Sequence, residues 1–145
     1  MAGYLSIVRF EIRPFQGNAR ELIPFVDDVS LVDLIAEFES HMDDTALGGY
    51  AGPVLEHFRP LEDLEGYLFG HGWPEDGRAA LLGCSCGELG CWPLYARVHL
   101  DKGHVIWDQF TQPFRPQRDY SGFGAFMFDE RQYRMAVAEV AAAVA

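Results

Sequence analysis

Several features that would assign this chain to a functional class are missing from its sequence. No apolar run approaches the roughly 20 residues that a membrane-spanning helix needs. Lysine and arginine together number 11 against 22 aspartates and glutamates, which does not suit a nucleic-acid-binding surface. Phosphate-binding glycine loops, the Gly-x-Ser-x-Gly element and the His-Glu-x-x-His helix are absent as well. We therefore expect no membrane or nucleic-acid partner, and no familiar motif identifies an enzyme.

Cysteine is also scarce, with three residues in the chain. An odd number of thiols is unusual for a secreted disulfide framework, in which the cysteines pair. The first residues, Met1 to Leu5, carry no basic segment of the kind that begins a signal peptide. These absences predict a cytoplasmic protein with reduced thiols.

Apolar and aromatic residues, by contrast, are plentiful. Hydrophobic residues make up 49% of the 145 residues and aromatic residues 14%, which is enough for a packed core. This length is typical of one domain and no linker interrupts it, so we predict a single domain at 1–145. The expected order, β-β-α-(α)-β-β-β-α, lacks regular strand–helix alternation. We predict an α+β fold: an antiparallel sheet of about five strands with two or three helices packed on one side.

The N-terminal part shows two clear patterns. Residues 8–12 alternate apolar and charged side chains, as a half-buried strand does, and 21–26 is the expected return strand. Ser30 then provides an N-cap for a helix that ends near His41. Glu39 falls off the apolar stripe of this helix, so we expect it to face water.

The C-terminal part contains a predicted hairpin. Residues 94–100 and 104–110 alternate around the loop 101–103, a register that places Arg97 opposite Trp107 for a cation–π contact. The other predicted elements are a helical turn at 54–58, a short helix at 61–69, a buried strand at 79–84 and a C-terminal helix capped by Asp129.

Negative charge is concentrated in the middle of the chain. Residues 27–76 hold 13 of the 22 acidic residues and one basic residue, Arg59, and the net charge of the whole chain is −11. A solvated surface is the simplest interpretation. The alternative is an acidic face that docks a basic protein partner.

The three cysteines are Cys84, Cys86 and Cys91, all in one glycine-containing segment. Thiolates are strong zinc ligands, and a fourth ligand would come from a histidine or a carboxylate. The spacing C-x-C-x4-C is not the familiar zinc knuckle, so we favour a structural turn in which the cysteines pack as small hydrophobes. The acidic neighbour Glu88 disfavours a reactive thiolate. We predict no cofactor, with zinc as the alternative.

A second polar group lies in the aperiodic segment after the hairpin. Arg115 and Arg118 suit a clamp for a carboxylate or phosphate, and Asp119 with Tyr120 suits acid–base chemistry. The alternative is that Asp119 pairs with an arginine and the neighbouring prolines stiffen the crossing. Since this segment and the cysteine turn flank the open end of the hairpin, we predict a pocket there that Trp92 and these four residues line.

The C-terminal part also carries a distinctive set of motifs. They are LGCSCG at 82–87, GCWPL at 90–94, Trp107, Phe110, QP at 112–113, RP at 115–116, DYSGFG at 119–124, Phe126, FD at 128–129 and Tyr133. In these residues the chain resembles an uncharacterised family of small bacterial proteins of actinobacterial type. The resemblance covers somewhat over a third of the chain and implies no established activity.

Three functions remain open on this sequence. The first, which we favour, is a cytoplasmic, non-enzymatic binding or interaction domain that uses the acidic segment or the loops at the hairpin end. The second is a small zinc-stabilised domain built on the three cysteines. The third is a small enzyme acting from the loop between Arg115 and Tyr120.

Overall fold

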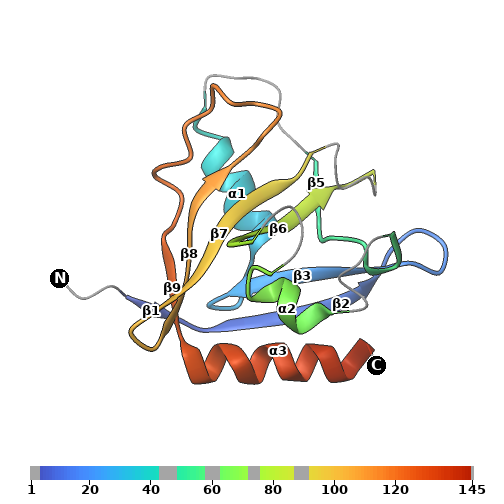
Figure 1. The fold of residues 1–145 in the computed structure, drawn as a ribbon. Helices are drawn as coiled ribbons and strands as arrows, with labels where there is room; N and C mark the ends of the chain where they lie inside the picture. Colours follow the sequence, from blue (N-terminus) through green and yellow to red (C-terminus); the bar gives the residue numbers. More distant parts are fainter. Residues whose placement is uncertain (1–3, 43–48, 58–62, 72–75, 87–91, 145) are drawn as a thin grey trace.

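The computed structural model describes residues 4–42, 49–57, 63–71, 76–86 and 92–144 (Figure 1). Its strands are β1 (Leu5–Ser6), β2 (Val8–Pro14), β3 (Arg20–Val26), β4 (Val29–Ser30), β5 (Tyr50–Ala51), β6 (Arg78–Cys84), β7 (Leu94–Asp101), β8 (His104–Thr111) and β9 (Phe126–Asp129). Its helices are α1 (Leu31–Glu39), α2 (Leu64–Leu68) and α3 (Glu130–Val144), with a 3₁₀ turn at Leu55–His57. Each predicted element has a counterpart, although residues 58, 61 and 62 lie outside the described ranges.

The strands form two sheets. The larger has the order β1-β9-β8-β7-β6-β5 and the smaller the order β2-β3-β4. Neighbouring strands are antiparallel except β1 and β9, which run parallel. The α+β class is confirmed, whereas the predicted five-stranded antiparallel sheet matches only roughly. The strands β1, β4, β5 and β9 are two to four residues long, too short to show an alternating pattern.

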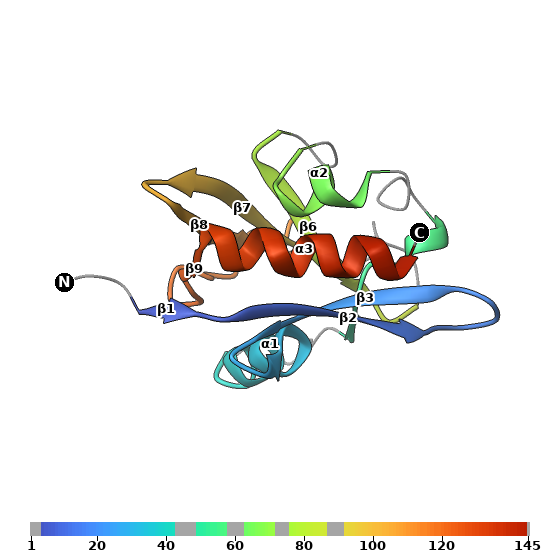
Figure 2. The same cartoon turned by 90° about the horizontal axis from the view of Figure 1, so that it is seen from below.

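The helices do not share one side of the molecule, contrary to the prediction. In Figures 1 and 2, α1 and α3 lie on opposite sides of the β2–β3 hairpin. Their first turns are capped as expected: Ser30 Oγ accepts from the Asp33 N–H at 3.0 Å, and Asp129 Oδ2 accepts from the Gln132 N–H at 3.0 Å. Within the described residues, no helix is both long and apolar enough to cross a bilayer.

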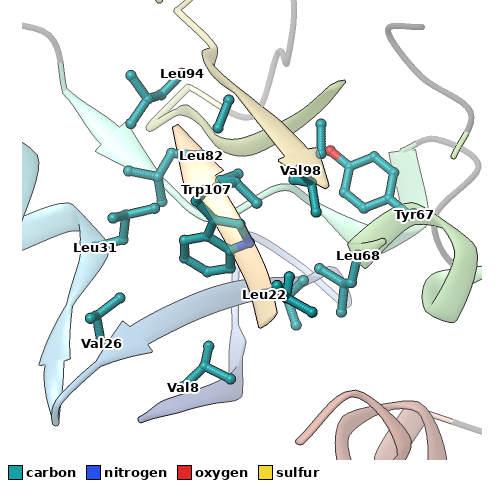
Figure 3. Close-up of a cluster of buried hydrophobic side chains, with 14 of the residues drawn as sticks. Val8, Leu22, Val26, Leu31, Tyr67, Leu68, Leu82, Leu94, Val98 and Trp107 are labelled. Carbon is teal, nitrogen blue, oxygen red and sulfur yellow. The ribbon is translucent and has the colours of Figure 1, made fainter. Parts of the chain in front are cut away.

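The hydrophobic core lies between the two sheets, and Trp107 of β8 stands at the centre of the cluster in Figure 3. This side chain is fully buried, and burying a large apolar side chain contributes about 1.5–3 kcal/mol to folding. Its Nε1 donates to the Tyr133 hydroxyl at 3.1 Å, and that hydroxyl donates to the Leu68 carbonyl. These polar atoms are thus paired where water cannot reach them.

The β7–β8 hairpin is confirmed, but its predicted register is wrong by one residue. The turn has two residues, Lys102 and Gly103, both with left-handed φ (52° and 83°), which is the turn that matches the strand twist. A shift of one residue moves a side chain to the other face of a sheet. Arg97 therefore faces Asp108, while Trp107 faces Val98 in the core, and the expected Arg97–Trp107 contact is not formed.

A bulge further along β8 leads into the candidate site. The register between β7 and β8 shifts beyond Asp108, where Gln109 has a left-handed φ of 51°. A bulge adds one residue to its strand and so changes which side chains point inward. Phe110 and Gln112, two residues apart, are both buried beyond it. The bulge therefore turns an amide side chain into the interior at the end of the hairpin.

Candidate binding site

The segment that follows β8 crosses the end of α1 (Figure 1). The Phe123 ring lies 4.8 Å from that of Phe110, and the Tyr120 ring stacks on Phe38 of α1 at 5.8 Å. Tyr120 and Phe123 are both buried. The segment is therefore a loop packed on the core through these two aromatic side chains.

Glu39, the last residue of α1, lies at the centre of the site with its side chain 1% exposed. Its Oε2 accepts from the Tyr120 hydroxyl at 2.5 Å, from the Tyr50 hydroxyl at 2.8 Å and from the Arg118 guanidinium at 3.2 Å. The prediction that Glu39 faces water is wrong, because α1 ends against the crossing loop and β5, which supply these three donors.

The cluster pairs a buried carboxylate with a buried cation. The Arg118 side chain, 2% exposed, pairs with Glu39, as a buried carboxylate requires. Burial first, and then the contact with Glu39, raise the pKa of Tyr50 and of Tyr120 above the ordinary phenol value. Both hydroxyls therefore stay protonated at neutral pH and donate to the carboxylate. The cluster fastens the crossing loop to α1 and β5.

Trp92 forms a second wall of the site. The Arg115 guanidinium lies 4.7 Å from its ring centroid and that of Arg118 lies 5.5 Å away, both within the range of a cation–π contact. Arg118 is engaged by Glu39. Arg115 donates to the Phe114 carbonyl at 3.1 Å and has no carboxylate partner in the part of the chain that the structure describes.

Two buried polar atoms beside this wall have no hydrogen-bond partner among the described residues: Trp92 Nε1 and Gln112 Oε1. Both adjoin Tyr50, since the Trp92 ring centroid lies 6.3 Å from that of Tyr50 and Gln112 Nε2 donates to its hydroxyl at 3.1 Å. Unpaired buried polar groups are uncommon in folded proteins. One donor and one acceptor beside Tyr50 are therefore left unpaired among the described residues.

Of the five residues predicted to line a pocket, the structure brings together Trp92, Arg115, Arg118 and Tyr120. Asp119 lies apart from them: its side chain is exposed and accepts from the Ser121 N–H at 2.9 Å. Hydrogen bonds from Ser121 lower the pKa of Asp119. The acid–base pair suggested by the neighbouring Asp119 and Tyr120 is therefore not assembled, because the Tyr120 hydroxyl binds Glu39 instead.

Three residues of the site were not predicted from the sequence: Glu39, Tyr50 and Gln112. A usable signal existed for Glu39, because it follows Leu31 and Ile35 at intervals of four, and all three are buried. Gln112 and Tyr50 gave no such signal. The first depends on the bulge in β8, and the second lies on a two-residue strand.

The cysteines stand at the edge of the described structure. Cys84 ends β6 half-buried, Cys86 is exposed, and Cys91 lies outside the described residues. The Cys86 N–H donates to Cys84 Sγ at 3.3 Å. Within the described ranges, no three His, Cys, Asp or Glu side chains gather in a way that would hold a metal. Zinc binding would need Cys91 and stays a prediction.

The acidic segment is distributed over several elements. Two of these, α1 and α2, lie on opposite sides of the β2–β3 hairpin in Figure 2. Glu39 is buried, and Glu56 is paired with Arg20 at 2.6 Å. A basic protein partner for residues 27–76 therefore stays a prediction.

Comparisons with protein-family models, with curated proteins and with solved structures yielded no match for this chain. The family resemblance of residues 82–133 stays a prediction. The geometry around Trp92 and Arg115 carries the functional inference instead.

Proposed function

We propose that this chain is a non-enzymatic binding domain whose ligand presents a carboxylate to Arg115. The observation that carries the proposal is the Arg115 guanidinium, held 4.7 Å from the Trp92 ring centroid without a carboxylate partner in the described part of the chain. The planar fork of a guanidinium matches a carboxylate, and stacking on an indole restricts its orientation. Arg115 is thus arranged to receive an acidic group.

The surroundings of Arg115 support a ligand that is both acidic and apolar. Phe114, next to Arg115, is 52% exposed. A ligand carboxylate would meet Arg115, while an adjoining ring or aliphatic group would cover Phe114. A peptide that ends in an aromatic residue combines both features.

The state of the neighbouring acid and phenol groups supports binding rather than catalysis. Glu39 accepts three hydrogen bonds on one oxygen. The raised pKa values of Tyr50 and Tyr120 keep both phenols protonated. Glu39 and the two phenols therefore hold the loop in place. A general base would need to lie within reach of a reacting proton, whereas Glu39 is already occupied by these hydrogen bonds.

A titration followed by the indole N–H signal of Trp92 in two-dimensional NMR tests the proposal. The probes are the tripeptide Gly-Gly-Phe with a free C-terminal carboxylate and the same peptide with a C-terminal amide, each up to about 10 mM, since a small contact of this kind binds in the millimolar range. We expect the Trp92 signal to shift with the acid and not with the amide. In Arg115→Gln the shift should be lost.

Arg134→Gln is the matched control. The Arg134 guanidinium also lies 4.7 Å from an aromatic centroid, that of Phe69, but it is already paired with Glu130 at 2.8 Å. This variant should retain the Trp92 shift. Equal shifts from the acid and the amide, or an undiminished shift in Arg115→Gln, would show that Arg115 does not receive a carboxylate.

A further inference from the structure

A separate surface, the free edge of β2, carries an inference that does not depend on the proposed function. Within the described ranges, β2 pairs with β3 alone in the smaller sheet. Phe10 faces Pro24, which has no N–H to donate, and Ile12 faces Leu22, whose N–H donates away from β2 to the Pro53 carbonyl at 3.0 Å. Facing residues in an antiparallel pair either both bond across it or both point away. The backbone groups of Phe10 and Ile12 therefore point to the open side.

Part of this edge is already closed by α3. Val8 has the same orientation as Phe10 and Ile12, but the Gln132 side chain binds both of its backbone groups. Gln132 Oε1 accepts from the Val8 N–H at 3.0 Å, and Nε2 donates to the Val8 carbonyl at 2.7 Å. Beyond Val8, the outward backbone groups of Phe10 and Ile12 have no partner among the described residues. An edge of this kind is a template for a further strand.

A groove of about 550 Å³ runs between β2 and α3 beside this edge. Phe10 and Ile12 line it from the strand, and Met135 and Val140 line it from the helix. Met135 is 67% exposed. A strand added to β2 would place alternate side chains over this groove and would cover Met135, so backbone pairing and apolar burial would act together.

We propose that the occupant is a second copy of this chain, with two β2 strands pairing antiparallel and Ile12 facing Ile12 across a two-fold axis. The charged side chains of β2 favour this register. Arg9, Glu11 and Arg13 alternate with the outward-bonding residues, and Glu11 forms ion pairs with both arginines. With Ile12 on the axis, Glu11 of each copy faces Arg13 of the other, which is the stabilising arrangement of cross-strand charges. Phe10 then faces Pro14, whose carbonyl accepts the Phe10 N–H but which has no N–H to donate in return.

The neighbouring registers are disfavoured by observations on the same strand. If Phe10 faces Ile12, Glu11 faces Glu11 and Arg9 faces Arg13, and like charges across a strand pair destabilise it. If Phe10 faces Phe10, the pairing requires the backbone groups of Val8, which Gln132 occupies. The charge pattern and the Gln132 contact thus select one self-complementary register. An unrelated extended peptide would not need either feature.

Sedimentation equilibrium across a range of concentrations, with the full chain, tests the proposal. We expect a species of twice the 16.3 kDa of the chain. Glu11→Arg and Arg13→Glu each place like charges across the axis and should weaken self-association by about tenfold or more. Mixed together, these two variants should form a heterodimer, because positions 11 and 13 then carry arginine in one chain and glutamate in the other. Both changes are on the surface, and circular dichroism checks that each variant is folded.

Ile12→Pro tests the backbone contact separately. Proline removes an N–H that points away from β3, which an edge strand tolerates, so the fold should persist while the dimer is lost. A wild-type chain that stays monomeric at about 100 µM, well above the micromolar range of specific association, overturns the proposal and leaves the edge to an extended peptide. A dimer that survives Ile12→Pro, or variants that fail to complement each other, overturns it as well.

Discussion

Two arginine–carboxylate pairs in this protein have similar chemistry and opposite surroundings. Arg97 and Asp108 face each other on β7 and β8 with two hydrogen bonds of 2.8 Å, and their side chains are 41% and 23% exposed. Arg118 and Glu39 meet through one contact of 3.2 Å, and theirs are 2% and 1% exposed. The exposed pair has the better geometry. Burial, rather than geometry, decides which pair the fold depends on.

The reason is the free energy lost when one member of an ion pair is removed and the other remains. Water replaces a lost partner at the surface, so an exposed ion pair contributes only about 0.2–1 kcal/mol. In the interior, removal of one partner leaves an uncompensated charge, which costs about 3–5 kcal/mol. The buried pair also joins residues 79 positions apart, whereas the exposed pair joins residues 11 apart in one hairpin. Loss of the buried pair should therefore loosen the whole loop crossing.

Glu39→Gln should produce the largest effect. The amide keeps the shape of the side chain but removes the buried negative charge that Arg118, Tyr50 and Tyr120 all contact, so we expect the free energy of unfolding to fall by about 3–5 kcal/mol. Urea denaturation measures it. Glu37→Gln, on the same helix but 75% exposed, is the control and should change stability by less than about 0.5 kcal/mol. A loss in Glu39→Gln as small as that in the control would contradict the importance of burial.

Tyr120→Phe should produce an intermediate effect. The phenylalanine ring can still stack on Phe38, but the hydroxyl that donates to Glu39 at 2.5 Å is lost. A hydrogen bond to a charged group contributes about 1.5–3 kcal/mol, and we expect a loss of that size in urea denaturation. Tyr4→Phe removes a hydroxyl from a side chain that is 73% exposed and should leave stability nearly unchanged. Equal losses in the two variants would mean that the contact with Glu39 adds nothing.

The two pairs also differ in how far the sequence predicts them. The β7–β8 hairpin follows from the alternation of apolar and polar residues and from Lys102-Gly103, so an ion pair across it can be predicted from the sequence. The predicted register is off by one residue because the prediction places three residues in the loop, whereas the turn has two. Turn length alone decides whether Arg97 faces Trp107 or Asp108.

The buried pair depends on information that local patterns do not contain. Trp92, Arg115, Arg118 and Tyr120 were predicted as neighbours because their segments flank the same end of a hairpin, and the structure brings them together. Glu39, which contacts Arg118 and Tyr120, comes from α1, and only the tertiary arrangement shows that α1 ends there. Charge was a misleading guide, since an acidic residue near a helix end is usually exposed.

Asp108→Asn should produce the smallest effect, and the effect should depend on pH. The hydrogen bond from Arg97, and then that from His99, lower the pKa of Asp108. A carboxylate with a lowered pKa in the folded state stabilises the fold fully above the unfolded aspartate value of about 3.9. This contribution is lost as the pH falls below that value toward the lowered pKa. The asparagine variant lacks the titration altogether.

The difference in unfolding free energy between wild type and Asp108→Asn should therefore be at most about 1 kcal/mol at pH 6 and should be smaller at about pH 2.5. Urea denaturation at both pH values measures it, and 0.5 M salt at pH 6 should reduce it further, since exposed charges are screened. A difference above about 3 kcal/mol at pH 6 would mean that this exposed pair contributes as much to stability as the buried pair of Glu39 and Arg118. Exposure would then no longer explain why the two pairs differ.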